Sequence, residues 1–149
     1  MEKRYYRVTV GQETRSYEEG TSYQKIAEEF QERFPHQIVL VYVDRFRLQE
    51  LEKTVNRDCE IEFVTTADPV GHQTYKRSMC FLLVKAVHDV GGHDKVERVR
   101  IHFSVSKGYF CTIEGDVSMD AEFLEKVEER MHILSRQRIP IEKRSVHTT

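Results

Sequence analysis

Apolar and polar positions in the first part of the chain follow the order strand, strand, helix, strand, short helix, strand. Residues 6–10 alternate as a half-buried strand does, and turn residues at 11–13 allow residues 14–17 to return as its hairpin partner. Residues 38–43 are a β-branched run typical of a buried strand, and residues 59–64 alternate again. This order indicates an α+β unit.

A helix is predicted between these two pairs of strands. Residues 21–24 have the pattern of a capping box, which places the start of a helix there. The apolar positions that follow share one helical face; they are Tyr23, Ile26, Ala27, Phe30 and Phe34. After the strand at 38–43, Asp44 and Arg45 are typical of a turn, and the spacing of Leu48 and Leu51 predicts a short helical turn.

The second part of the chain begins with a predicted linker at residues 67–71. Pro69 disfavours helix at Asp68, and Gly71 adds a second breaker. A long helix is expected from about residue 72 to residue 90, ended by the glycine pair at 91–92. Its expected apolar face consists of Tyr75, Met79, Leu82, Leu83, Ala86, Val87 and Val90.

Two strands and a last helix are predicted to follow. Residues 96–105 and 109–113 alternate as strands joined at Lys107 and Gly108. Asp120 or Ser118 can cap a helix that Pro140 ends, after which Ile141 begins a possible strand. The residues that this helix is expected to bury are Leu124, Val127, Met131 and Leu134.

Composition narrows the classes of function only slightly. The 149 residues suffice for one ordinary domain or two small ones, and 39% hydrophobic residues support a core. A net charge of -2 does not by itself favour nucleic acid or membrane as a partner, so any such contact needs a local patch. The chain has no apolar run long enough for a membrane span and no signal-peptide pattern, and we expect a cytoplasmic protein without a membrane partner.

The three cysteines predict neither a disulfide framework nor a redox motif. Cys59, Cys80 and Cys111 are odd in number, lie among apolar residues and lack CxxC spacing. We therefore expect buried structural thiols in a reducing compartment.

Several segments of the first part resemble a TGS domain, a β-grasp module found in threonyl-tRNA synthetase, certain GTPases and (p)ppGpp synthetases. The segments that carry the resemblance are residues 8–11, 19–22 with 26–27, 51–55 and 60–64. The resemblance covers about residues 5–66 and implies a β-grasp domain at residues 1–66.

The second part resembles the beginning of the threonyl-tRNA synthetase editing region. Residues 81–87, 107–110, 125–131 and 139–141 carry this resemblance, which implies a partial, truncated editing-like α+β module at residues 72–149. The family would have histidines at the positions of Arg77 and Phe81, where two imidazoles one turn apart can grip a metal or polarise a water. Arginine and phenylalanine can do neither, and the family's other Cys and His site residues would lie beyond Thr149.

A third resemblance concerns a kinase-linked group. Residues 77–87 and 104–111 are more similar to the N-terminal region of bacterial uridine kinase-like (nucleoside kinase) proteins, in which a P-loop kinase domain follows. The resemblance implies an attached kinase domain that uses ATP and Mg. This chain has no GxxxxGK(S/T) motif to hold a triphosphate, and we expect it to have no cofactor, no metal and no catalytic residue.

One helix face supplies most of the ligand-binding candidates. Arg77, Phe81 and Lys85 recur at one-turn spacing on it, and His102 and Lys107 from the adjoining strands can approach it. Arginine binds phosphate in bidentate fashion and phenylalanine offers a stacking face, so these five residues suggest an anion or nucleotide pocket. The alternative is a solvated face whose charges pair with nearby carboxylates.

Other polar groups favour simpler interpretations. His88 and His93 with two nearby aspartates invite a metal site, but spacing defines no third ligand, which favours a polar turn. Ser104, Ser106 and Cys111 are candidate nucleophiles. The sequence defines no base that would activate any of them, which favours ordinary strand residues.

Two basic clusters are possible RNA contacts. The first consists of Lys3, Arg4 and Arg7 with Tyr5 and Tyr6; the second is Arg45 with Arg47 on a predicted loop. Basic side chains bind phosphate and tyrosines stack on bases, but an acidic run at residues 28–32 weakens the local field and favours a solvated surface.

Three hypotheses follow from the sequence. The first is a non-catalytic region that binds nucleotide or RNA, or regulates an attached nucleoside kinase. The second is a divergent aminoacyl-tRNA editing or deacylase fragment. The third is a structural module for positioning or oligomerisation, which an apolar exposed face on the second module would favour.

Overall fold

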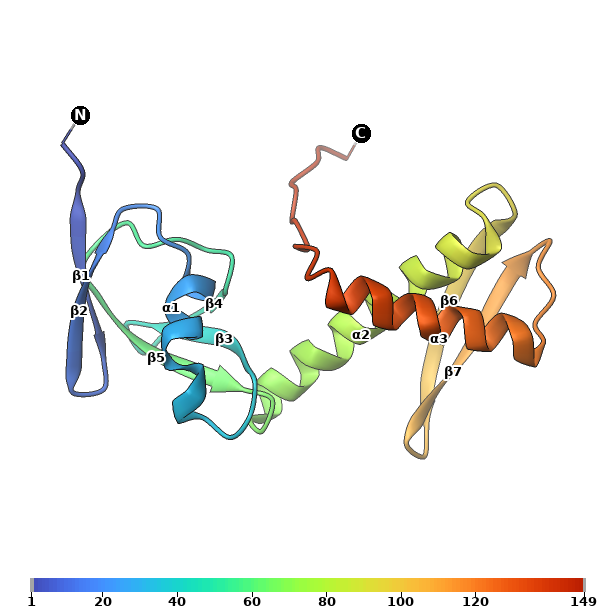
Figure 1. Cartoon of the computed structure of the whole chain (residues 1–149), viewed down its shortest axis with the longest axis horizontal. Helices are drawn as coiled ribbons and strands as arrows, with labels where there is room; N and C mark the ends of the chain where they lie inside the picture. Colours follow the sequence, from blue (N-terminus) through green and yellow to red (C-terminus); the bar gives the residue numbers. More distant parts are fainter. Residues whose placement is uncertain (1, 149) are drawn as a thin grey trace. The chain divides into compact units, whose positions relative to one another are not determined.

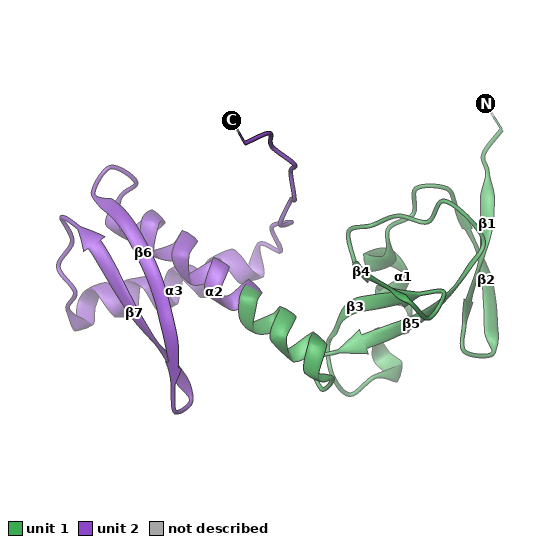
Figure 2. Ribbon diagram, turned by 180° about the vertical axis from the view of Figure 1, so that it is seen from behind, with its two compact units in different colours: residues 1–77 green, residues 78–149 purple. Residues whose placement is uncertain are grey.

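The computed structural model describes residues 2–148 and has an α+β fold. The chain divides into two compact units, residues 1–77 and residues 78–149 (Figure 2). Each unit buries an apolar cluster of its own. Within residues 2–148, none of the helices combines the length and the apolar character that crossing a membrane requires.

The first unit contains a five-stranded sheet, one complete α-helix and the beginning of a second (Figure 1). Its elements are β1 (Tyr5–Val10), β2 (Glu13–Glu18), α1 (Tyr23–Phe30), β3 (Ile38–Val43), β4 (Arg47–Glu50) and β5 (Cys59–Thr65), with a 3-10 turn at Gln31–Arg33 after α1. The strand order is β2-β1-β5-β3-β4. The first and last strands, β1 and β5, are parallel neighbours, and every other pairing is antiparallel.

Helix α1 and the inward side chains of the sheet form the core of this unit. Ile26 and Phe30 of α1 are buried in one cluster with Val8, Val41 and Ile61 of three different strands. The ring centroids of Phe30 and Phe63 are 5.6 Å apart, a distance typical of paired aromatic side chains. The predicted alternation and helix face therefore describe this core correctly.

The start of α1 differs from the predicted capping box by one residue. Ser22 is the N-cap, because its side chain accepts a hydrogen bond from the backbone N–H of Lys25 at 3.2 Å. The Thr21 hydroxyl instead donates to the carbonyl of Glu18 at 2.7 Å. The α-helix ends at Phe30, yet Phe34 still packs edge-on against Phe63, with ring centroids 5.8 Å apart.

The predicted turn at Asp44 and Arg45 is confirmed, but the short helical turn at Leu48 and Leu51 was wrong. Both turn residues have positive φ, 51° and 68°, and they lead into strand β4 at Arg47. In the hairpin Val43 faces Arg47 and Tyr42 faces Leu48. Hydrogen bonding of this segment to β3 therefore favours a strand, although the three-residue spacing of the leucines favoured a helical turn.

The second unit contains the hairpin β6 (Val96–Val105) and β7 (Gly108–Gly115) and helix α3 (Ala121–Arg136) (Figure 1). Helix α2 (Pro69–Gly91) begins in the first unit and continues into the second. The buried cluster of the second unit consists of Ala86, Val87, Val96, Phe123, Val127 and Leu134. Strand β6 has the predicted bounds, and α2 ends at the glycine pair as expected, with Gly92 at φ 94°.

Helix α2 starts earlier than predicted. It begins at Pro69, so residues 69–71 of the expected linker are helical and the expected start near residue 72 was too late. Proline lacks only an N–H that the first helical turn does not use, and its φ suits the first helical position. Asp68 closes the preceding turn, since its carboxylate accepts a hydrogen bond from the N–H of Thr65 at 2.8 Å.

Parts of the predicted apolar faces are exposed. On α2, Tyr75 and Met79 are 47% and 36% exposed, although Ala86 and Val87 are buried. On α3, capped by Asp120 as expected, Leu124 is 54% exposed and Phe123 takes its place in the core. Position 123 is four residues before Val127, so the actual stripe keeps a helical period with a different first member.

Two further predictions about the second unit were wrong. Helix α3 ends at Arg136, before Pro140, and residues 139–148 have neither helix nor strand, so the expected strand at Ile141 is absent from this described segment. Of the three free cysteines, only Cys59 is buried, whereas Cys80 and Cys111 are half-buried.

Gly115 at the end of β7 is expected to tolerate no side chain. Its φ is 135°, and an added Cβ would lie 2.1 Å from the carbonyl oxygen of Lys95. Gly115→Ala should lower the free energy of unfolding by about 2–4 kcal/mol, measured by urea denaturation. The matched control is Gly108→Ala, where the nearest atom is 3.9 Å away. Equal stability of the two variants would contradict this account of the β7 end.

Candidate functional site

Three of the five predicted ligand-binding residues lie on α2. Arg77 is exposed in the first unit, and its side chain has no hydrogen bond or ion pair within residues 2–148. Phe81, one turn later, is 57% exposed. Lys85 is occupied, because its ammonium group lies 3.2 Å from a carboxylate oxygen of Asp89. The helix therefore presents an exposed cation and an exposed ring at one-turn spacing, as its sequence indicated.

The other two predicted residues lie on the β6–β7 hairpin. The Nε2 atom of His102 is 2.8 Å from the hydroxyl oxygen of Thr112 on the facing strand. Its ring lies 5.5 Å from the ring of Phe110. Lys107 is exposed in the hairpin turn, next to Ser106 at φ 54°. No hydrogen bond, ion pair or ring contact within residues 2–148 joins Phe81 or Lys85 to His102 or Lys107.

Sequence reasoning missed the aromatic residues beside His102. Phe103 and Phe110 face each other across the hairpin, with ring centroids 5.3 Å apart and an angle of 19° between the rings. They are 59% and 48% exposed, and Tyr109 is 44% exposed. We call His102, Phe103, Lys107 and Phe110 the hairpin cluster.

Register explains why this pairing was hard to predict. A β-bulge lies between Ile101 and Phe103, and it shifts Phe103 into register with Phe110. The alternation of the two strands was visible in the sequence, but the bulge was not. The combination of nearly parallel exposed rings with a cation can stack on a planar ligand and pair with an anion.

A second polar centre lies around Asp89 in the second unit. Its carboxylate is only 12% exposed and accepts a hydrogen bond from Arg130 of α3 at 2.9 Å. Lys85 and His93 approach the other oxygen at 3.2 Å and 3.3 Å. Burial raises the pKa of Asp89, but the hydrogen bonds from Arg130 and Lys85 outweigh it and leave the pKa below its usual value. Asp89 is therefore ionised, and its ion pair with Arg130 links α2 to α3.

The histidines near Asp89 do not assemble a metal site in the described chain. The rings of His88 and His93 stack with centroids 5.6 Å apart. Within residues 2–148, no group of three or more His, Cys, Asp or Glu side chains is arranged to hold a metal ion.

The proposed nucleophiles are poorly placed for catalysis. Burial and the neighbouring Cys80 raise the pKa of the Cys111 thiol, which keeps it protonated at neutral pH. Its Sγ atom donates only to the backbone carbonyl of Tyr109, at 3.9 Å. Ser104 and Ser106 make no side-chain hydrogen bond to another residue of 2–148. An activated nucleophile needs a base within hydrogen-bonding reach, and none of the three has one in the described part of the chain.

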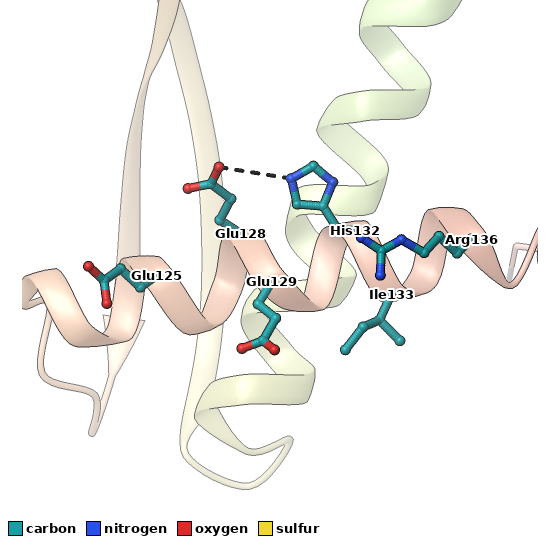
Figure 3. Close-up of a pocket in the computed structure, with 6 residues that line it drawn as sticks. All are labelled: Glu125, Glu128, Glu129, His132, Ile133 and Arg136. Carbon is teal, nitrogen blue, oxygen red and sulfur yellow. Dashed lines mark ion pairs between the residues drawn. The ribbon is translucent and has the colours of Figure 1, made fainter.

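A shallow hollow of about 330 Å³ lies on the outer face of α3 (Figure 3). Its lining residues all belong to that one helix: Glu125, Glu128, Glu129, His132, Ile133 and Arg136. The side chains fan out from the helix rather than converge, and Glu128 pairs with His132 at 3.9 Å. The hollow is therefore a solvated helix face, on which charged side chains one turn apart pair with one another.

The basic cluster at the start of the chain is mostly paired with carboxylates. Lys3 lies 3.2 Å from Glu18, and Arg7 lies 3.6 Å from Asp58. These pairs are exposed and contribute little to stability, but they reduce the local positive potential. This favours the solvated surface over an RNA contact at this cluster.

Three relatives show what the chain is similar to. It is 28% identical to a threonine–tRNA ligase of Thermotoga neapolitana over 89% of its length. It is 26% identical over 87% of its length to a threonine–tRNA ligase of Halorhodospira halophila, and 29% identical over 67% to one of Methylococcus capsulatus. The chain spans about a fifth of the length of the first two relatives, 20% of each. No family model matches the chain.

The Asp89 carboxylate is expected to stabilise the second unit. Asp89→Asn should lower the free energy of unfolding at pH 7 by about 1–3 kcal/mol, since it leaves Arg130 without its anion. A lowered pKa in the folded state means that the stabilisation is complete above the usual value of 3.8 and is lost as pH falls below it.

The measurement is urea denaturation followed by circular dichroism between pH 7 and pH 2. The variant should lose less stability than the unchanged chain below pH 3.8. Glu122→Gln is the matched control, because its carboxylate is 74% exposed and pairs only with Lys126. An Asp89→Asn curve parallel to that of the unchanged chain would refute the role of this carboxylate.

Proposed function

We propose that this chain is an RNA-directed recognition region related to the N-terminal part of threonine–tRNA ligases. The hairpin cluster carries the proposal, because Phe103 and Phe110 expose nearly parallel rings beside His102, with Lys107 in the turn. A base whose face is not covered by another base can stack on such rings, and the lysine can pair with a phosphate. The hairpin cluster would therefore bind an unpaired segment of RNA.

The relatives support the synthetase-related class. Their names state that they join threonine to tRNA, and two of them match nearly 90% of this chain. The first unit, with its parallel β1–β5 pair and antiparallel flanking strands, is compatible with a TGS-like β-grasp domain at residues 1–66. The helices and hairpin of the second unit are compatible with part of an editing-like module at residues 72–149.

Binding without hydrolysis fits the side chains better than deacylation does. Arg77 and Phe81 stand where the resembling synthetases would have histidines, so neither can act as a metal ligand or a neutral base. Lys85 is held by Asp89, and the thiol of Cys111 has a raised pKa. The chain is therefore proposed to recognise RNA rather than to cleave an ester bond.

The hairpin cluster is expected to contribute directly to the binding of short unstructured RNA. Phe103→Ala and Phe110→Ala should each weaken binding by about 5- to 100-fold, the range expected for loss of one stacking contact. The measurement is fluorescence anisotropy of a labelled single-stranded RNA. Leu124→Ala is the matched control, since it removes an apolar side chain of similar exposure, 54%, from α3. If all three variants bind as the unchanged chain does, the hairpin cluster is not the site.

The divergent deacylase is the enzymatic alternative, and a direct assay separates it from a binding region. Mischarged tRNA of the threonine system is incubated with the chain, and release of the amino acid is followed over time. We expect release at the rate of the uncatalysed control. If the chain releases the amino acid faster than the control, and Arg77→Ala abolishes this release, the chain is a hydrolase with a new site and the proposed binding region is wrong.

A kinase-linked regulatory region is the second candidate function. Its support is the sequence of residues 77–87 and 104–111, in which arginine and phenylalanine replace the expected histidines. None of the three relatives carries a kinase name, and the similarity favours the synthetase-related class. In this candidate the hairpin cluster would bind a nucleotide, and the ATP and Mg would belong to an attached kinase domain.

The coding sequence downstream of Thr149 tests the kinase-linked candidate. A P-loop motif there would support a nucleoside kinase, because that loop cradles the phosphates of the triphosphate. A synthetase catalytic domain, or a chain that ends without a P-loop, would remove this candidate.

A further inference from the structure

The turn between β3 and β4 of the first unit exposes a phenylalanine almost completely. Phe46 is 91% exposed, more than any of the other large apolar side chains exposed in residues 2–148. It stands between Arg45 and Arg47, and we call these three residues the Arg-Phe-Arg turn. A single exposed apolar side chain is ordinary on a protein surface, so the case for a ligand at Phe46 depends on the backbone and the charges around it.

The backbone beneath Phe46 is held in place by Asp44. The N–H of Asp44 donates to the carbonyl of Glu60 at 2.8 Å, and one carboxylate oxygen accepts from the N–H of Glu60 at 3.0 Å. The other oxygen accepts from Arg57 at 2.7 Å. Asp44 and Arg45 both have positive φ, 51° and 68°. Residues other than glycine adopt this backbone conformation at a cost in free energy. The contacts of Asp44 hold this strained turn, and the ring is presented by a fixed backbone.

The ring lies between two arginines, of which one is paired with a carboxylate and the other is not. Arg45 is 74% exposed and only loosely paired with Glu60, at 3.9 Å. Arg47 is exposed, and its side chain has no hydrogen bond or ion pair within residues 2–148. Arg57 neutralises Asp44, which leaves the cation of Arg47 without a nearby partner anion. A ring flanked by arginines therefore faces solvent with an excess of positive charge.

We propose that the Arg-Phe-Arg turn binds an unpaired nucleotide of single-stranded RNA. Phe46 would stack on the base, and Arg45 and Arg47 would pair with the flanking phosphates. Guanidinium groups form bidentate hydrogen bonds with phosphate, which also orients the strand across the ring. The choice of RNA as ligand rests on the proposed function, but the site lies in the first unit and shares no residue with the hairpin cluster.

The size of the apolar surface favours a nucleotide over a protein partner. Within the turn and β4, the large apolar side chains that are exposed are Phe46 and Leu48, the latter 40% exposed. A stable protein interface needs a larger apolar centre with a polar rim. One ring with two adjacent guanidinium groups instead matches one base with two adjacent phosphates.

A tryptophan reporter tests the Arg-Phe-Arg turn directly. The chain contains no tryptophan, so Phe46→Trp introduces a fluorophore that reports on this turn alone. Titration of the full chain with a single-stranded RNA should quench the fluorescence of this variant, because a stacked base quenches indole emission. A duplex of the same sequence should quench it much less, since its bases are already stacked on one another.

Two further variants measure the energetic contribution. Phe46→Ala should weaken binding of single-stranded RNA by about 5- to 100-fold. Arg47→Ala should weaken it and lower the slope of log K against log salt concentration by about 0.7, the loss of one phosphate contact to a single strand. Val146→Ala, at an 81% exposed apolar position, and Lys25→Ala, an exposed cation of α1, are the matched controls and should change neither quantity.

Phe103→Trp, a reporter in the hairpin cluster, separates this inference from the proposed function. Quenching of F103W without quenching of F46W, together with unchanged binding by Phe46→Ala, would overturn the inference and leave the proposed function standing. Quenching of neither reporter would overturn both. Concentration-dependent self-association of the chain in sedimentation, abolished by Phe46→Ala, would show that the ring serves a protein contact and would likewise overturn the inference.

Discussion

The carboxylate of Asp89 links α2 to α3 within the second unit. This unit buries few apolar side chains, and Asp89 adds an ion pair from α2 to Arg130 of α3 in a position only 12% exposed. A mostly buried carboxylate must be paired to be stable, and here the helix neighbour Lys85 provides the second cation. The same pairing removes Lys85 from the set of free cations on α2. Thus a residue suggested by the sequence as a ligand contact instead stabilises the fold.

Elements with strong local signals could be predicted from the sequence. The strands at residues 38–43 and 96–105 have the predicted bounds, because their β-branched and alternating residues leave little choice of structure. Strand β4 was missed because its four residues become a strand only by pairing with β3. Leu124 and Tyr75 were assigned to the core by period alone, whereas burial depends on which elements pack there.

The candidate sites depend on nonlocal geometry to a greater extent. Arg45 and Arg47 were recognisable as a basic pair, but the exposure of Phe46 between them follows from a turn with positive φ at Asp44 and Arg45. Likewise, His102 and Lys107 were candidates from the sequence, while the ring pair of Phe103 and Phe110 requires a bulge at one point in β6. Bulges and left-handed turns at non-glycine residues have weak sequence signals, so aromatic side chains displayed by them escape prediction.

The charge of the chain constrains how it can bind RNA. With a net charge of -2, the chain as a whole gains little from the long-range attraction that draws basic proteins to phosphate. Under the proposed function, binding would come mainly from short-range stacking, and both proposed contacts place exposed rings beside a few cations. Stacking on a single ring requires a base with a free face, which a duplex does not offer. Under the proposed function, the two exposed hairpins would therefore select unpaired RNA by shape, with only modest dependence on base sequence.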